Sequence, residues 1–137
     1  MPWGWVGPGI KSTVNSASFT VISDILGPAN FTLVNNRRYK ISALCSLGQT
    51  GSGACDHFVT ICKGDNTILV SSAQSSAGSG ITVQHNLFTY FDCTASGTQA
   101  LKMRASNNNS LAMFMNGVAP YNAYLIVEDI GPVTAPA

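Results

Sequence analysis

Charged side chains are scarce in this chain of 137 residues. Only 9% of the residues are Asp, Glu, Lys or Arg, whereas an average globular protein carries roughly 25%. The formal net charge of +1 argues against electrostatic attraction to nucleic acid or to an anionic membrane. A surface with so few charges is also poorly protected against association. We therefore expect no nucleic-acid partner and expect the chain to pack against copies of itself or other subunits; a neutral surface without partners is the alternative.

Long apolar runs and a targeting segment are missing as well. No stretch approaches the roughly 20 apolar residues of a membrane span, so no membrane insertion is expected. Residues 1–9 have neither the basic start nor the apolar centre of a signal peptide. We therefore expect a chain that is made and kept in the cytoplasm, unless another machine exports it or the cell lyses.

Cysteine is present at four positions, none of them in a C-x-x-C pair. An oxidised chain would allow three pairings, but without a secretory route free thiols are expected. Reduced cysteines within strands behave as small buried hydrophobic residues. The four positions are Cys45, Cys55, Cys62 and Cys93.

Helical periodicity is nearly absent, and polarity comes from 15 Ser, 11 Thr and 11 Asn. Tyr39, Ile41 and Ala43 alternate with polar residues, as in a strand with one buried and one solvated face. Similar segments recur between clusters of Gly, Asn, Asp and Ser. This pattern predicts an all-β fold, an antiparallel two-sheet β-sandwich of about eight or nine strands, and favours a jelly roll. The expected strands are 18–23, 30–35, 38–47, 57–63, 67–71, 82–92, 98–105, 111–116 and 122–128.

Turn residues and the chain ends complete this outline. Asn35-Asn36 predicts a tight link between strands, and Gly64-Asp65-Asn66 predicts a hairpin. Gly131-Pro132 is expected to stop the last strand, because proline has no N–H to donate. We divide the chain into a Pro/Gly/Trp arm (1–10), the sandwich domain (11–132) and a short tail (133–137).

Both tryptophans, Trp3 and Trp5, lie in the arm. Tryptophan is a favoured interface anchor, so we expect these two residues to anchor the chain on a partner. The alternative is that they fold back onto their own sandwich.

A metal site is one chemistry that the sequence raises. Cys55, His57 and Cys62 form a C-x-H-x4-C cluster, and His85 is the other histidine. Structural zinc needs four ligands, commonly in close pairs, and strand alternation places Cys62 opposite His57. We therefore expect core cysteines, a surface histidine, and no metal or cofactor. No G-x-S-x-G nucleophile motif is present either.

Glycoside hydrolysis needs two carboxylates across a cleft. Glu128 and Asp129 are adjacent, so strand alternation points them to opposite faces. We expect Glu128 instead to pair with Arg37, Arg38 or Arg104 at a sheet end. The sequence therefore predicts no catalytic residue and no enzyme.

Carbohydrate binding is the ligand class that the composition leaves open. Phe88, Tyr90, Tyr121 and Tyr124 are available as stacking platforms, with abundant Asn and Ser as hydrogen-bonding partners. Tyr90 and Tyr121 are the predicted glycan contacts. The alternative is that these aromatic rings pack the second face of the sandwich or an oligomer interface.

Three segments stand in a recognisable order: NRRYKISA at 36–43, GTQALKMRA at 97–105 and LIVEDIGP at 125–132. This order and approximate spacing resemble the small β-rich minor tail proteins of phages that infect actinobacteria. The resemblance covers residues 12–132 and departs from the family in the four cysteines and the Asn-rich turn at 107–109. The residues that carry its structural signature are Arg38, Tyr39, Glu128, Asp129, Gly131 and Pro132.

The resemblance implies a virion structural domain without catalytic residues. We expect a minor tail protein of the tail tip or fibre, on the particle exterior, which contributes to host adsorption. Its expected partners are copies of itself in a homotrimer, other virion proteins and host cell-wall glycan. One alternative is a head decoration protein held by Trp3 and Trp5, and another is a carbohydrate-binding module.

Overall fold

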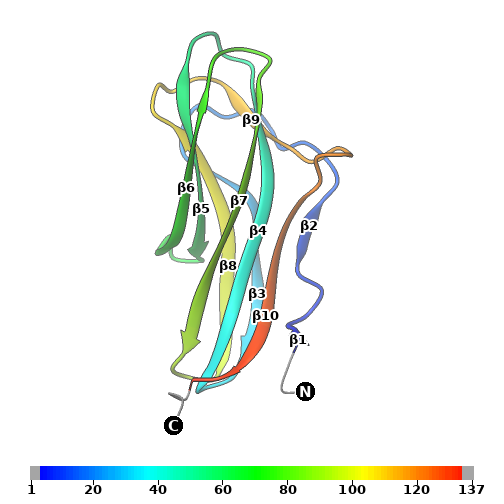
Figure 1. Cartoon of the computed structure of the whole chain (residues 1–137), viewed down its shortest axis with the longest axis vertical. Helices are drawn as coiled ribbons and strands as arrows, with labels where there is room; N and C mark the ends of the chain where they lie inside the picture. The colour runs from blue at the N-terminus through cyan, green and yellow to red at the C-terminus, as the bar shows by residue number, and fades with distance from the viewer. Residues whose placement is uncertain (1–3, 134–137) are drawn as a thin grey trace.

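The computed structural model describes residues 4–133, which form ten strands and no helix. No helix long and apolar enough to cross a membrane therefore occurs in this range. Figure 1 shows the strands running roughly lengthwise through an elongated molecule. They are β1 (Gly4–Trp5), β2 (Ile10–Ser12), β3 (Ser23–Leu33), β4 (Arg37–Gln49), β5 (Cys55–Lys63), β6 (Ile68–Ser76), β7 (Thr82–Cys93), β8 (Gly97–Asn107), β9 (Met113–Asn116) and β10 (Ala123–Pro132).

The strands form two antiparallel sheets. Sheet A has the order β1-β10-β4-β7, with β2 also on β10 and β9 also on β4, and sheet B has the order β3-β8-β5-β6. Without β1 and β9, the orders are β2-β10-β4-β7 and β3-β8-β5-β6. This is the topology of an eight-stranded jelly roll built from two Greek keys. The predicted fold class is confirmed, and two short strands raise the total to ten.

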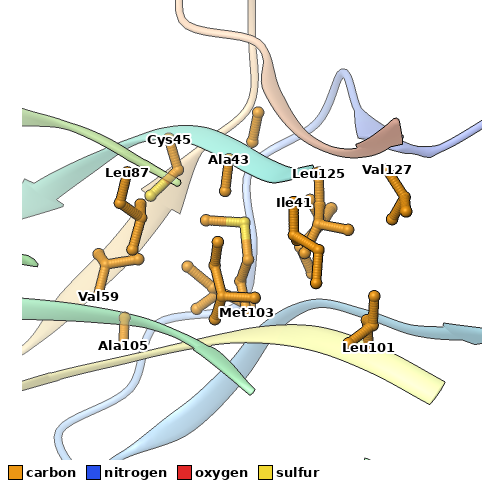
Figure 2. Packing of buried hydrophobic residues seen from close by; sticks show 14 of the residues in the cluster. Ile41, Ala43, Cys45, Val59, Leu87, Leu101, Met103, Ala105, Leu125 and Val127 are labelled. Atoms are coloured by element: carbon orange, nitrogen blue, oxygen red, sulfur yellow. The ribbon is translucent and has the colours of Figure 1, made fainter. Parts of the chain in front are cut away.

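The core lies between the sheets, where alternate residues of each strand point inward. Figure 2 shows Ile41, Ala43 and Leu125 from sheet A facing Leu101 and Met103 from sheet B. All five of these side chains are fully buried. The predicted alternation of Tyr39, Ile41 and Ala43 is therefore the one that builds the core, and Leu101 and Met103 of the expected strand 98–105 meet it from the other sheet.

The N-terminal part of the sandwich differs from the sequence prediction. No strand covers 18–22, where Phe19 forms only an isolated bridge with Met113, and β3 begins at Ser23. The expected strand at 30–35 is instead the end of an 11-residue strand, β3. The Gly27-Pro28 pair resembles a strand break, but β3 is the edge strand of sheet B. An edge strand tolerates proline and takes up irregularities such as the register shift between Leu26 and Ala29.

The last strand also runs further than its predicted end at 128. Its register with β4 shifts between Asp129 and Gly131, and pairing then continues to Pro132, which lies opposite Arg37. Gly131 has a φ of 120°, a conformation that favours glycine. The strand therefore ends at Pro132, after the bulge, rather than at residue 128.

The two predicted tight turns are confirmed. Asn36 has a φ of 61° between β3 and β4, and Asn66 has a φ of 73° between β5 and β6. In the second turn, the Asn66 N–H donates to the Lys63 carbonyl at 3.0 Å. Asparagine tolerates this left-handed conformation better than most residues.

Candidate functional site

The two histidines that the sequence raised for metal binding lie in the interior of the sandwich. His57 and His85 are both fully buried, so the expectation of a surface histidine was wrong. Because β5 begins at Cys55, His57 points inward beside it, and β7 brings His85 inward from the opposite sheet. Burial lowers the pKa of both histidines, that of His85 to about 4. Within residues 4–133, no group of three His, Cys, Asp or Glu side chains is placed to hold a metal ion.

Polar neighbours accommodate the two buried imidazoles. Nε2 of His57 lies 3.1 Å from Oε1 of Gln49, and the Cys55 thiol donates to the same oxygen at 3.2 Å. Nδ1 of His85 lies 3.0 Å from the Ser72 hydroxyl. Each contact holds one nitrogen of its ring, and burial favours the neutral form of both rings, which suits a structural role.

The four cysteines are buried free thiols. Burial raises the pKa of Cys45 to about 12, and burial also raises the pKa of Cys55. A thiol must ionise to act as a nucleophile, so neither of these two is an activated nucleophile.

The carboxylates serve as ion-pair partners, and one predicted pairing was wrong. Arg37 pairs with Asp129 rather than with Glu128, at 2.8 Å between Nη2 and Oδ1. Arg38 pairs with Asp92 at 2.6 Å. Strand alternation explains the exchange. Asp129 lies opposite the buried Tyr39 and shares the inward side with Arg37, whereas Glu128 lies opposite Lys40 on the other side of the sheet.

The exposed aromatic residues gather on the outer face of sheet A, where strand register arranges them in rows. The first row crosses β7, β4, β10 and β1 and consists of Tyr90, Lys40, Glu128 and Trp5. An aromatic residue thus stands at each end of this row, with a cation and a carboxylate between them. Tyr90 is 57% exposed and Trp5 is 64% exposed.

Two further rows extend this surface along the strands. Phe88, Ser42 and Ile126 form the second row. The third row crosses β7, β4, β10 and β2 and consists of Asn86, Leu44, Tyr124 and Lys11. We refer to the three rows together as the outer face of sheet A.

Contacts within the outer face of sheet A hold its aromatic rings in place. The Phe88 and Tyr90 rings meet edge to face, with centroids 5.9 Å apart. The Lys40 ammonium lies 5.0 Å from the centroid of the Phe88 ring, within the range of a cation–π contact. At the other edge, a shallow groove of about 320 Å³ opens between the N-terminal segment and β10, lined by Trp5, Pro8, Ile10, Lys11, Tyr124 and Ile126.

The predicted site residues fall in different places. Tyr90 and Trp5 lie in one row of the outer face of sheet A, whereas Tyr121 lies in the loop before β10, outside the rows. Trp3 lies outside the described residues. Sequence reasoning did not place Lys40 and Glu128 between Tyr90 and Trp5, because that arrangement depends on the register of four strands.

Comparison with known proteins gives no family. No family model matches the chain, and no curated protein matches it. Among solved structures, the CBM22-1–GH10 modules of Clostridium thermocellum xylanase 10B match with 8% identity and a TM-score of 0.38, over 100% of this chain and 30% of that one. The infectious bursal disease virus Gt strain structure matches with 10% identity and a TM-score of 0.38, over 96% of this chain and 38% of that one.

An α-L-arabinofuranosidase, MgGH51, matches with 14% identity and a TM-score of 0.35, over 87% of this chain and 19% of that chain. The chain thus spans well under half the length of each of these structures. Likenesses at this level carry no conclusion about function.

Proposed function

We propose that this chain is a non-enzymatic structural protein of a tailed-phage virion, a minor tail protein of the tail tip or fibre. It is exposed on the particle exterior and contributes to host adsorption. The observation that carries the proposal is the place of the resembling segments in the fold. Segments 36–43 and 125–132 lie in β4 and β10, which are neighbours in sheet A.

The residues at this β4–β10 seam interlock. Arg37 and Asp129 pair across it, and the Val133 N–H donates to the Asn36 carbonyl at 2.8 Å. Next to the seam, the buried Tyr39 hydroxyl accepts a hydrogen bond of 2.8 Å from the Val34 N–H and ties β4 to the turn after β3. The residues that resemble the phage proteins therefore hold one structural joint together, which supports a shared fold rather than a chance match of surface residues.

The third resembling segment, 97–105, lies within β8 in the middle of sheet B. Leu101 and Met103 from this strand are fully buried in the core. On the other side of the strand, Lys102 and Arg104 both pair with Asp24 of β3. All three segments thus occupy central or joining positions in the sandwich.

Self-association is part of the proposal, with a homotrimer as the expected assembly. Several large apolar side chains are exposed, and such residues mark contact surfaces when they gather. They include Val14 at 65%, Val21 at 67%, Ile22 at 47% and Val118 at 50%. Light scattering on the purified chain measures the assembly directly, and a monomer at all concentrations contradicts this part of the proposal.

The experiment that tests the virion assignment is immunogold electron microscopy of intact particles made from a genome that encodes the chain. Antibody against the purified chain is expected to place gold at the tail tip or fibres. Gold spread over the head contradicts the tail assignment. Unlabelled particles, together with absence of the chain from purified virions by mass spectrometry, contradict the virion assignment altogether.

A head decoration protein is the second candidate, and the exposed Trp5 favours it. This side chain is 64% exposed although its backbone pairs with Glu128, so its ring is available to a capsid surface. Deleting residues 1–10 is then expected to abolish binding to heads that lack the protein. Binding that survives the deletion of the arm rules out this mode of anchoring.

A further inference from the structure

We propose that the outer face of sheet A binds a neutral glycan, with sugar rings stacked on Tyr90 and Phe88 at one edge and on Trp5 at the other. Host adsorption would then depend on binding a neutral glycan. That the glycan comes from the host surface rests on the proposed function. The binding surface itself follows from the arrangement of side chains on β7, β4, β10 and β1.

Exposure of the aromatic rings is the first step. Trp5, Phe88 and Tyr90 are 64%, 53% and 57% exposed, and large rings held in water on one face mark a contact surface. Tyr90 and Trp5 stand three strands apart in one row. At ~4.8 Å per strand this separation is ~14 Å, so the row suits a chain of several sugar rings rather than one.

Rigidity of the Phe88 and Tyr90 rings is the second step. Phe88 is held edge to face against Tyr90 and lies near the Lys40 ammonium. Both rings stand on β7, which pairs with β4 along 12 residue positions. Because the platform is already ordered, a ligand loses little free energy in fixing it.

The charges between the rings select the ligand class. Lys40 and Glu128 lie side by side in the first row, and Ser42 and Asn86 stand in the rows beyond. Lys11 is the other cation in the rows, so two cations face one carboxylate. This near balance offers little attraction for an acidic polymer or nucleic acid.

A flat protein partner is disfavoured by the same residues. Closing a dry interface over Lys40 and Glu128 would remove both charges from water, which is costly. Sugar hydroxyls, in contrast, both donate and accept hydrogen bonds, and they leave the ammonium and the carboxylate partly hydrated. Alternation of aromatic rings with such polar groups therefore matches a polyhydroxylated ligand.

The test is a glycan array probed with the purified full-length chain. Each glycan that captures the chain is then titrated in soluble form against the chain in solution. Neutral glycans on the array are expected to capture the wild-type chain. Phe88→Ala and Tyr90→Ala are each expected to weaken binding about tenfold, the loss that ~1.4 kcal/mol of contact energy represents. Tyr121→Ala is the matched control, since this tyrosine is 44% exposed but lies outside the rows, and it is expected to leave binding unchanged.

Several outcomes overturn the inference. The inference is contradicted if no neutral glycan on the array captures the chain. It is also contradicted if Tyr121→Ala weakens glycan binding as much as Phe88→Ala and Tyr90→Ala do. Light scattering that shows a dimer dissociated by Phe88→Ala and Tyr90→Ala, with no glycan bound, assigns the outer face of sheet A to a second copy of the chain. A chain that binds glycan but is absent from virions supports the binding surface and contradicts the proposed function, so the two fail separately.

Discussion

Arg37 and Asp129 are 92 positions apart in the sequence and form an ion pair at the β4–β10 seam. Nε of Arg37 donates to both carboxylate oxygens, at 3.1 and 3.0 Å, and Nη2 donates to Oδ1 at 2.8 Å. The same Oδ1 accepts the Gly131 N–H at 3.0 Å. The carboxylate therefore fixes both the bulge in β10 and the start of β4.

Asp129→Asn is expected to destabilise the fold by about 2–3 kcal/mol, because the Arg37 side chain is only 19% exposed and would lose its ion pair with Asp129. The matched control is Asp92→Asn, which breaks the Arg38 pair; those side chains are 48% and 40% exposed. That change is expected to cost clearly less, because water screens an exposed ion pair. Urea unfolding of both variants gives the comparison, and equal losses would show that the Arg37–Asp129 pair has no special role.

Acid is expected to destabilise the sandwich through its buried histidines. The pKa of His85 falls from 6.5 to about 4 on burial, so below pH 6.5 the unfolded chain binds a proton that the folded chain does not. The stability that the low pKa of His85 contributes is therefore fully present above pH 6.5. It is lost as the pH falls toward 4, and the loss amounts to about 3 kcal/mol for this residue. His57 adds to the loss in the same direction.

Thermal unfolding between pH 7 and pH 4 measures this effect. His85→Asn places a side chain that does not titrate beside Ser72 and is expected to flatten the pH dependence. If the variant and the wild type lose stability in parallel, the histidine is not responsible.

The buried thiols are expected to resist modification in the folded protein. Cys45, Cys55, Cys62 and Cys93 are all buried and free, and thiol reagents need an ionised and accessible sulfur. Ellman's reagent should react slowly with the native chain and release four equivalents in denaturant. Fewer equivalents under non-reducing conditions would reveal a disulfide and contradict the structure.

Close packing of two loops makes Gly117 sensitive to substitution. A Cβ at this position would collide with the Val14 carbonyl oxygen, so the backbone would have to move. Gly117→Ala is expected to cost about 1–3 kcal/mol through this overpacking. Gly78→Ala serves as the control, because no atom lies within 4 Å of its added Cβ, and it should leave the melting temperature unchanged.

Much of the fold was predictable from local pattern. The alternation of Tyr39, Ile41 and Ala43 identified the inner face of β4, and the asparagine turns were read correctly. The start of β3 was predicted too late because Gly27-Pro28 resembles a strand break. Proline interrupts a central strand but not an edge strand, and whether a strand lies at an edge depends on the order of strands in the sheet. His57 was misplaced for a related reason: its burial depends on Gln49, which reaches it from a different sheet.

The candidate site was only partly predictable. Exposed aromatic residues such as Tyr90 could be nominated from alternation within one strand. The row that joins Tyr90, Lys40, Glu128 and Trp5 depends on three strand pairings, which periodicity along the chain does not specify. Pairing register is set by long-range contacts, so a sequence pattern identifies members of such a surface singly and not their arrangement.

The measurement that tests the central claim most directly is phage adsorption to host cells in competition with the purified chain. If the outer face of sheet A contacts the host surface, the wild-type chain slows adsorption in proportion to its concentration. The Phe88→Ala, Tyr90→Ala double variant then fails to slow it, while Tyr121→Ala competes like the wild type. Adsorption that is unaffected by a saturating excess of the wild-type chain, or slowed equally by the double variant, would contradict the account.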